Sequence, residues 1–154
     1  MNRIDKALMT ELCTKANASE RKRSHHTLHD SHSDPVQRVV IGLAPGTYVR
    51  PHFHKGDSRW EMLMVIQGSL TLFFFDDTGK VAQQMDLSHT GHLRLVEIPP
   101  HRWHTIAVSE ANTVIMEIKE GPFDPATLVF APWAPEEGEE TVTEYLAELT
   151  AAKQ

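Results

Sequence analysis

Short runs of hydrophobic residues, separated by turn-forming residues, dominate the chain from Val36 onward. The runs are rich in Val, Ile, Leu, Phe and Thr, which favour strands, while the intervening Pro, Gly, Asp and Asn favour turns. This spacing is typical of all-β sandwiches and barrels. Because no helix-length segment separates the runs, we expect antiparallel sheets rather than a parallel βαβ sheet. Strands are predicted over residues 36–43, 47–54, 60–67, 69–75, 80–86, 92–98, 102–109 and 112–119.

Different patterns flank this β-rich region. Apolar residues recur at helical spacing from Arg3 to Ala16, which predicts an amphipathic helix, and a similar stripe begins at Val142. The residues between Ala16 and Val36 are too polar for a core and predict a loop or arm. We therefore divide one domain into three parts: an N-terminal helix and polar arm (1–35), a barrel (36–120), and a proline-rich wrap with a C-terminal helix (121–154).

Two of the predicted strands have informative side-chain patterns. The three consecutive phenylalanines at 73–75 predict a strand that is buried on both faces, against a second sheet or another subunit. In the last strand, Glu117 and Lys119 alternate with Val114, Met116 and Ile118. Such alternation normally separates a solvated face from a core face, so the two charged residues are predicted to face solvent, with the cavity as the alternative.

Composition and charge narrow the function classes. The chain has 154 residues, 40% of them hydrophobic and 23% charged, with a net charge of −6. A negative protein is poorly suited to nucleic acid or to an anionic membrane. No apolar run approaches the roughly 20 residues of a membrane-spanning helix, and the N-terminus lacks a secretory pattern. The single Cys13 suits a reducing compartment, so a cytoplasmic location is predicted.

The chemistry is concentrated in the histidines, of which there are ten. His52 and His54 are two residues apart in a predicted strand, so both imidazoles face the same side. Glu61 on the next strand and His104 on a later strand complete a candidate metal site. Three imidazoles and one carboxylate suit one divalent transition metal: Fe, Mn, Ni, Co or Zn. The alternatives are hydrogen-bonded core histidines, and for Glu61 an ion pair with an arginine.

These residues and their spacing resemble the cupin family. The first cupin motif is present as Gly46-TYVRP-His52-Phe53-His54-KGDSRW-Glu61-MLMVIQ-Gly68, with a longer gap than usual before Glu61. The second motif corresponds to Pro99-Pro100-His101-Arg102-Trp103-His104, where His101 replaces the usual glycine. The resemblance implies a cupin barrel, a double-stranded antiparallel β-helix or jelly roll, with His52, His54, Glu61 and His104 as metal ligands.

A narrower resemblance covers nearly the whole chain. The sequence is similar to the WbuC-type cupin-fold metalloproteins, which are associated with O-antigen and other surface-polysaccharide gene clusters. The segments that carry it are ERKRSHHTLHDSHSDPVQR, PGTYVRPHFH, RWEMLMVIQGSL, FDDTGKV, EIKEGPFDP and APWAPEEG. This resemblance implies a cupin barrel with a divalent metal, but it does not supply a reaction. The broader cupin resemblance implies a homodimer.

Several polar residues are candidates for binding a substrate beside the metal. Continued alternation from His52 and His104 turns Tyr48, Arg50 and Arg102 toward the pocket, where the arginines would bind a carboxylate or phosphate. The alternative is that these residues lie on the surface. The polar arm contributes Arg21, Arg23 and His29, with its other histidines. This arm is interpreted as a set of pocket-closing contacts, a surface loop or a second metal site.

Three functions are consistent with the sequence. The first is the processing of a small polar molecule, such as a sugar or sugar derivative in surface-polysaccharide metabolism, with the metal as a Lewis acid in an isomerase or epimerase. The second is a non-haem iron dioxygenase. The third is a small-ligand binding or sensing module without catalysis. The sequence leaves open whether the protein is an enzyme.

Overall fold

The structure is a computed structural model, and it describes residues 1–108 and 110–151. Ser109, the last residue of one predicted strand, and residues 152–154, the end of the predicted last segment, lie outside the described residues. The elements in chain order are α1 (Lys6–Ala18), β1 (Arg23–Thr27), β2 (Val36–Leu43), β3 (His52–His54), β4 (Glu61–Gln67), β5 (Ser69–Phe75), β6 (Val81–Ser88), β7 (Leu95–Ile98), β8 (His104–Val108), β9 (Thr113–Glu120), a short 3-10 helix (Pro125–Thr127), β10 (Leu128–Phe130) and α2 (Val142–Ala151).

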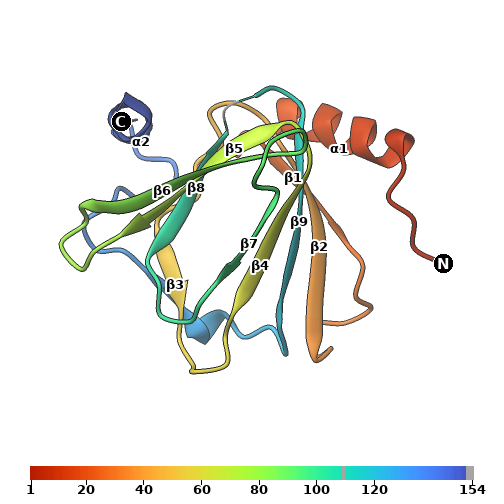
Figure 1. The fold of residues 1–154 in the computed structure, drawn as a ribbon, viewed down its shortest axis with the longest axis horizontal. Coiled ribbons are helices and arrows are strands. Elements are labelled where there is room, and N and C mark those ends of the chain that lie inside the picture. Colours follow the sequence, from red (N-terminus) through yellow and green to blue (C-terminus); the bar gives the residue numbers. More distant parts are fainter. Residues whose placement is uncertain (109, 152–154) are drawn as a thin grey trace.

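The strands form two five-stranded antiparallel sheets that face each other (Figure 1). One sheet has the order β1-β2-β9-β4-β7, and the other has the order β10-β3-β8-β5-β6. The main hydrophobic core lies between them and includes Ile41, Leu63, Leu72, Phe74 and Ile115. The predicted all-β antiparallel fold with short terminal helices is therefore confirmed.

Two strands lie outside the region predicted to form the barrel. The polar arm contains β1, which pairs with β2 along its whole length, and the proline-rich wrap contains β10, which pairs with β3. Both are edge strands of their sheets. A hydrophobic pattern does not reveal them, because β1 has the polar sequence RSHHT and β10 has only 3 residues, too few to show a period. The prediction of a loop over the whole arm is thus wrong.

Helix α1 covers the outer face of the first sheet (Figure 1). Asp5 caps its start by accepting a hydrogen bond from the amide of Leu8 at 3.0 Å. Leu12 and Cys13 then pack on Val40 of β2 and on Val114 of β9. The helix approaches the sheet closely where β2 has a glycine.

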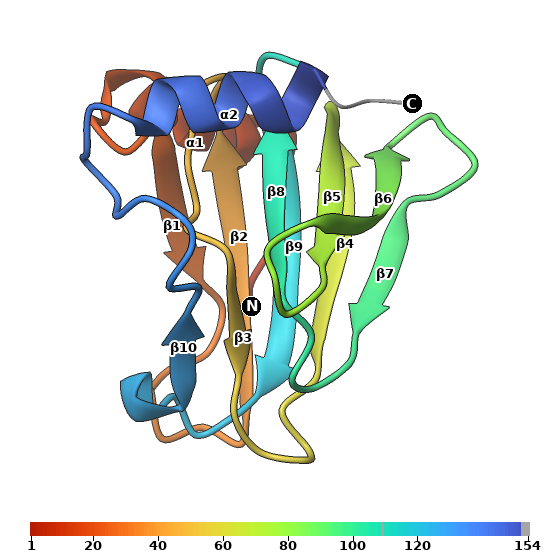
Figure 2. The same ribbon diagram turned by 90° about the vertical axis from the view of Figure 1, so that its left-hand side faces the viewer.

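The phenylalanine run is buried on both faces of β5, as its sequence predicts. Phe74 points into the core between the sheets, while Phe73 and Phe75 pack with Trp133 and with Leu149 of α2. Helix α2 lies across one end of the strands, where it covers this second cluster (Figure 2). The second layer on β5 is therefore the chain's own C-terminal segment.

Among residues 1–108 and 110–151, no helix is long and apolar enough to cross a membrane.

Gly42 is the position at which α1 docks on the sheet. A Cβ atom there would lie 2.7 Å from backbone atoms of Leu12. We expect Gly42→Val to displace α1 and to lower the free energy of unfolding by about 3 kcal/mol, the upper end for overpacked sites. Urea denaturation of the purified protein measures this change.

Gly91→Ala is the control for loss of a glycine, because its Cβ would meet only Ser88, at 3.3 Å. We expect this variant to change the free energy of unfolding by less than about 1 kcal/mol. Equal effects of both substitutions would contradict a docking role for Gly42.

Candidate metal centre and its cavity

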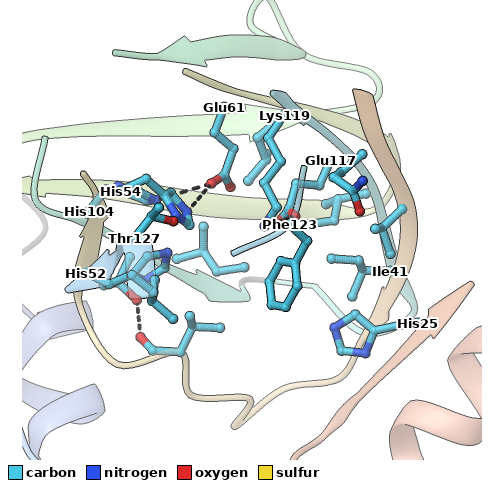
Figure 3. Close-up of a pocket in the computed structure, with 18 of the residues that line it drawn as sticks. His25, Ile41, His52, His54, Glu61, His104, Glu117, Lys119, Phe123 and Thr127 are labelled. Atoms are coloured by element: carbon cyan, nitrogen blue, oxygen red, sulfur yellow. Dashed lines mark hydrogen bonds and ion pairs between the residues drawn. The ribbon is translucent and has the colours of Figure 1, made fainter. Parts of the chain in front are cut away.

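Three strands of the two sheets bring the four predicted metal ligands together (Figure 3). His52 and His54 lie at the two ends of β3, and His52 is directly opposite His104, the first residue of β8. Glu61 is the first residue of β4 in the facing sheet. The longer gap before Glu61 is taken up in the loop after His54 and leaves the carboxylate beside the imidazoles.

The interatomic distances show a compact cluster. Nε2 of His54 is 3.1 Å from Oε2 of Glu61, and Nε2 of His104 is 3.9 Å from the same oxygen. Ligand atoms of His52, His54 and Glu61 all lie within 4.8 Å of one another. The rings of His52 and His104 have centroids 4.5 Å apart. His52, His54 and Glu61 can therefore converge on one small ion, and His104 lies beside Glu61 as the fourth candidate ligand.

Backbone carbonyls fix the orientation of two of the imidazoles. Nδ1 of His52 is 2.9 Å from the carbonyl oxygen of Arg50, and Nδ1 of His104 is 2.8 Å from that of Arg102. Each Nδ1–H donates to its carbonyl, so Nε2 carries the lone pair that faces the cluster. Nε2 of His104 is buried and has no hydrogen-bond partner within the described residues.

The electrostatics favour an anionic carboxylate among neutral imidazoles. Burial raises the pKa of the Glu61 carboxyl, but the hydrogen bond with His54 and the charge of Lys119 outweigh it and hold this pKa well below its ordinary value. Burial lowers the pKa of His52 to about 3 and also lowers that of His104. Metal ions bind ionised carboxylates and neutral imidazoles, so the protonation states fit a divalent cation.

The cluster opens into a cavity of about 760 Å³ between the sheets. Ile41, Leu63 and Ile115 form apolar parts of its wall. Polar and charged side chains from β1, β9 and the segment after β9 line the remainder. Its size lies within the range of ordinary small-molecule sites.

Glu117 and Lys119 line this cavity, so the prediction that they face solvent is wrong. They form an ion pair of 2.8 Å, and Lys119 is directly opposite Glu61 across the β9–β4 pair. The other face of β9 is not solvated either, because Val114 and Met116 pack under α1. The alternation correctly predicts two different faces of β9. Helix α1 covers the apolar face, and the charged face lines the cavity.

The other substrate-binding candidates divide into two groups. Four of them line the cavity: Arg21, Arg23, His29 and Arg50. Tyr48 and Arg102 lie outside it. The hydroxyl of Tyr48 donates to the carbonyl of Pro135 at 2.8 Å, and the exposed Arg102 lies over the ring of Phe74, 5.4 Å from its centroid. Neither residue is in a strand, so the alternation that turned them inward does not apply to them.

His101, which replaces the usual glycine of the second motif, keeps the backbone conformation that a glycine favours. Its φ is 59°, in the left-handed region, and its side chain is exposed beside Asp57. The turn before β8 is therefore retained with a residue that tolerates this region better than most. His104 keeps its place at the start of the strand as a result.

Thr27 and Phe123, which sequence reasoning missed, also line the cavity, as does His25 of the polar arm. The spacing of Arg23, His25 and Thr27 is a period of two and could have indicated one face of a strand. Polar residues on both faces concealed this signal. Nothing in the sequence around Phe123 indicates that it reaches the cavity.

Comparison with known families gives one match. The family model described as "Domain of unknown function (DUF6016)" matches residues 4–87. A search of curated proteins finds no match.

Solved structures with cupin barrels resemble the fold. A cupin superfamily protein from Desulfitobacterium hafniense DCB-2 has a TM-score of 0.52 and 23% identity, with 71% of this chain and 86% of that chain covered. KdgF from Halomonas sp. has a TM-score of 0.52 and 15% identity, with coverages of 68% and 83%. A recombinant oxalate oxidase in complex with glycolate has a TM-score of 0.54 and 16% identity, with coverages of 75% and 58%. The chain spans only 27% of the oxalate decarboxylase of Lactobacillus farciminis. At these identities the likeness concerns the fold, a cupin jelly-roll barrel.

A cluster of ion pairs at the cavity rim predicts how the stability of the protein depends on pH. Glu137 binds Arg21 at 2.8 Å and Arg23 at 2.7 Å. Burial raises the pKa of Glu137, but the hydrogen bonds from the two arginines outweigh it and lower the pKa from 4.5 to about 2. A lowered pKa stabilises the fold above the ordinary value, and this contribution is lost as the pH falls from 4.5 toward 2. We expect Glu137→Gln to lower the free energy of unfolding at neutral pH, and we expect this decrease to become smaller as the pH falls.

Urea denaturation of the parent and of Glu137→Gln between pH 7 and pH 2 tests this expectation. Glu140→Gln, in the same exposed segment, controls for the loss of one negative charge. A difference between parent and Glu137→Gln that stays constant over the whole pH range would contradict the role of the ion pairs.

Proposed function

The chain belongs to the family described as "Domain of unknown function (DUF6016)", and from its cupin fold and histidine cluster we propose that it is a metal-binding cupin. The ion would be one divalent transition metal, held by His52, His54, Glu61 and His104. The observation that carries the proposal is the buried Nε2 of His104, which has no protein partner within the described residues and lies 3.9 Å from the Glu61 carboxylate. Buried polar atoms in folded proteins almost always have a binding partner, so we expect this nitrogen to bind a ligand.

The residues of the chain prepare the site for such an ion. The carbonyls of Arg50 and Arg102 hold two imidazoles in the tautomer that leaves Nε2 free. Lys119 and His54 keep Glu61 ionised. When bound, the metal supplies Lewis-acid chemistry, polarising a carbonyl or hydroxyl oxygen of a substrate. The apolar wall of the cavity packs against the carbon skeleton of the substrate, and polar side chains around it bind the polar groups of the substrate.

The substrate that we propose is a small polar molecule, such as a sugar or sugar derivative of surface-polysaccharide metabolism. The similarity of the chain's segments to WbuC-type proteins supports this assignment. The cavity of about 760 Å³, with polar groups around an apolar centre, accommodates such a ligand. The reaction would be an isomerisation or epimerisation.

Metal analysis tests the site directly. We expect the protein, purified without a histidine tag, to contain about one divalent metal ion per chain. His52→Ala and His104→Ala should each weaken metal affinity by more than about 100-fold, because even partners of metal ligands contribute 10–100-fold. Elemental analysis and competition with a chelator measure both quantities.

His92→Ala serves as the matched control, since His92 is exposed and lies outside the cavity. It should retain the metal content of the parent. Absence of stoichiometric metal from the parent, even after divalent ions are added back, would contradict the proposal. Iron with oxygen uptake would identify a non-haem iron dioxygenase instead of a Lewis-acid enzyme, and tight ligand binding without turnover would identify a sensing module.

A further inference from the structure

Strand β1 turns one face toward the cavity, on the side away from the histidine cluster. In the β1–β2 ladder, His25 is opposite Ile41 and Thr27 is opposite Val39. Residues directly opposite each other in an antiparallel pair lie on the same face of the sheet. Ile41 belongs to the core between the sheets, so His25 and Thr27 face inward, and both line the cavity.

The histidine cluster and β1 lie at different ends of the cavity. Glu61 is on β4, and the sheet order places β9 and β2 between β4 and β1. Three strand spacings separate the axes of β4 and β1 by roughly 14 Å. Figure 3 shows His25 across the cavity from His52, His54 and His104, with the ring of Phe123 between them in this view. A ligand that contacts both ends must extend across the cavity.

The polar groups at the β1 end are neutral hydrogen-bonding groups. Nδ1 of His29 is 2.9 Å from the amide nitrogen of Arg38 and 3.0 Å from its carbonyl oxygen. The backbone therefore engages Nδ1, and Nε2 is left to hydrogen-bond a hydroxyl group as a donor or an acceptor. Thr27 supplies a hydroxyl, and burial together with the charge of Arg23 lowers the pKa of His25, which favours the neutral imidazole with one donor and one acceptor.

The cation on β1 itself is already bound within the protein. Arg23 pairs with Glu137 at 2.7 Å and donates to the carbonyl of Tyr48 at 2.8 Å. Its side chain is only 8% exposed. The β1 end therefore offers uncharged donors and acceptors, which match the hydroxyl groups of a ligand better than a second anionic group.

We propose that His25, Thr27 and His29 bind hydroxyl groups of a ligand whose carbonyl or carboxylate oxygen lies at the histidine cluster. The ligand class is a polyhydroxylated acid or carbonyl compound that extends across the cavity. Phe123, which is 45% exposed and lines the cavity, offers an apolar surface to the C–H groups of the ligand. This inference rests on the proposed function, because the metal holds the other end of the ligand.

Two six-carbon carboxylates, gluconate and hexanoate, separate the contribution of the hydroxyl groups from that of the carboxylate. Isothermal titration of the metal-loaded protein measures both dissociation constants. We expect His25→Leu and the near-isosteric Thr27→Val to weaken gluconate binding by about tenfold each, the equivalent of one lost hydrogen bond. Hexanoate binding should change by less than about threefold, since hexanoate has no hydroxyl groups.

Two further variants guard against a general structural effect. His26→Leu alters the opposite face of the same strand, where His26 is paired with Val40, and should leave gluconate binding unchanged. His25→Asn keeps a hydrogen-bonding side chain and should restore most of the gluconate affinity. Circular dichroism confirms that each variant is folded.

The outcomes distinguish this inference from the proposed function. If the protein holds its metal but gluconate does not bind, or binds equally well to His25→Leu and Thr27→Val, the role of β1 is overturned and the metal site stands. If the protein holds no metal while gluconate binding still depends on His25 and Thr27, the role of β1 stands and the proposed function is overturned.

Discussion

The buried carboxylate of Glu61 is the constraint on which the rest of the structure depends. It has only 5% of its surface exposed, and a charge taken out of water must be compensated by nearby groups. The barrel supplies these groups from both sheets: His54 and His104 from the facing sheet and Lys119 from the neighbouring strand. The short strand β3, the register of β9 on β4 and the turn before His104 all serve to bring these groups near the Glu61 carboxylate.

Much of the fold and of the site could be predicted from the sequence because both follow from local periodicity. Alternating apolar runs place strands without any knowledge of their partners, and the two-residue spacing of His52 and His54 fixes their common face. Which face of a strand is enclosed is harder to predict, because it depends on elements far away in the chain that cover that face. Glu117 and Lys119 were assigned to solvent because only the docking of α1 on Val114 shows which face of β9 is enclosed.

The exact ends of the strands were a second source of error. They explain why some of the predicted substrate-binding residues lie outside the cavity. The prediction that Tyr48 and Arg102 face the pocket extends the strand alternation back through Pro51 and Trp103. The strands begin only at His52 and His104, so the alternation does not hold there. Conversely, β1 was read as a loop because it borders the open cavity and carries no apolar stripe. The apolar strand beside it, β2, identifies this polar strand more clearly, because the inward residues of β2 set its register.

The charges around Glu61 explain why a divalent cation suits this site. The imidazoles of His52 and His104 are neutral, so the carboxylates of Glu61 and Glu117 share one nearby ammonium group, that of Lys119. The cluster is therefore short of positive charge, and burial together with the charge of Glu61 raises the pKa of Glu117. A divalent ion would compensate the charge of Glu61 directly, and the buried Nε2 of His104, which has no hydrogen-bond partner within the described residues, would be available to bind it.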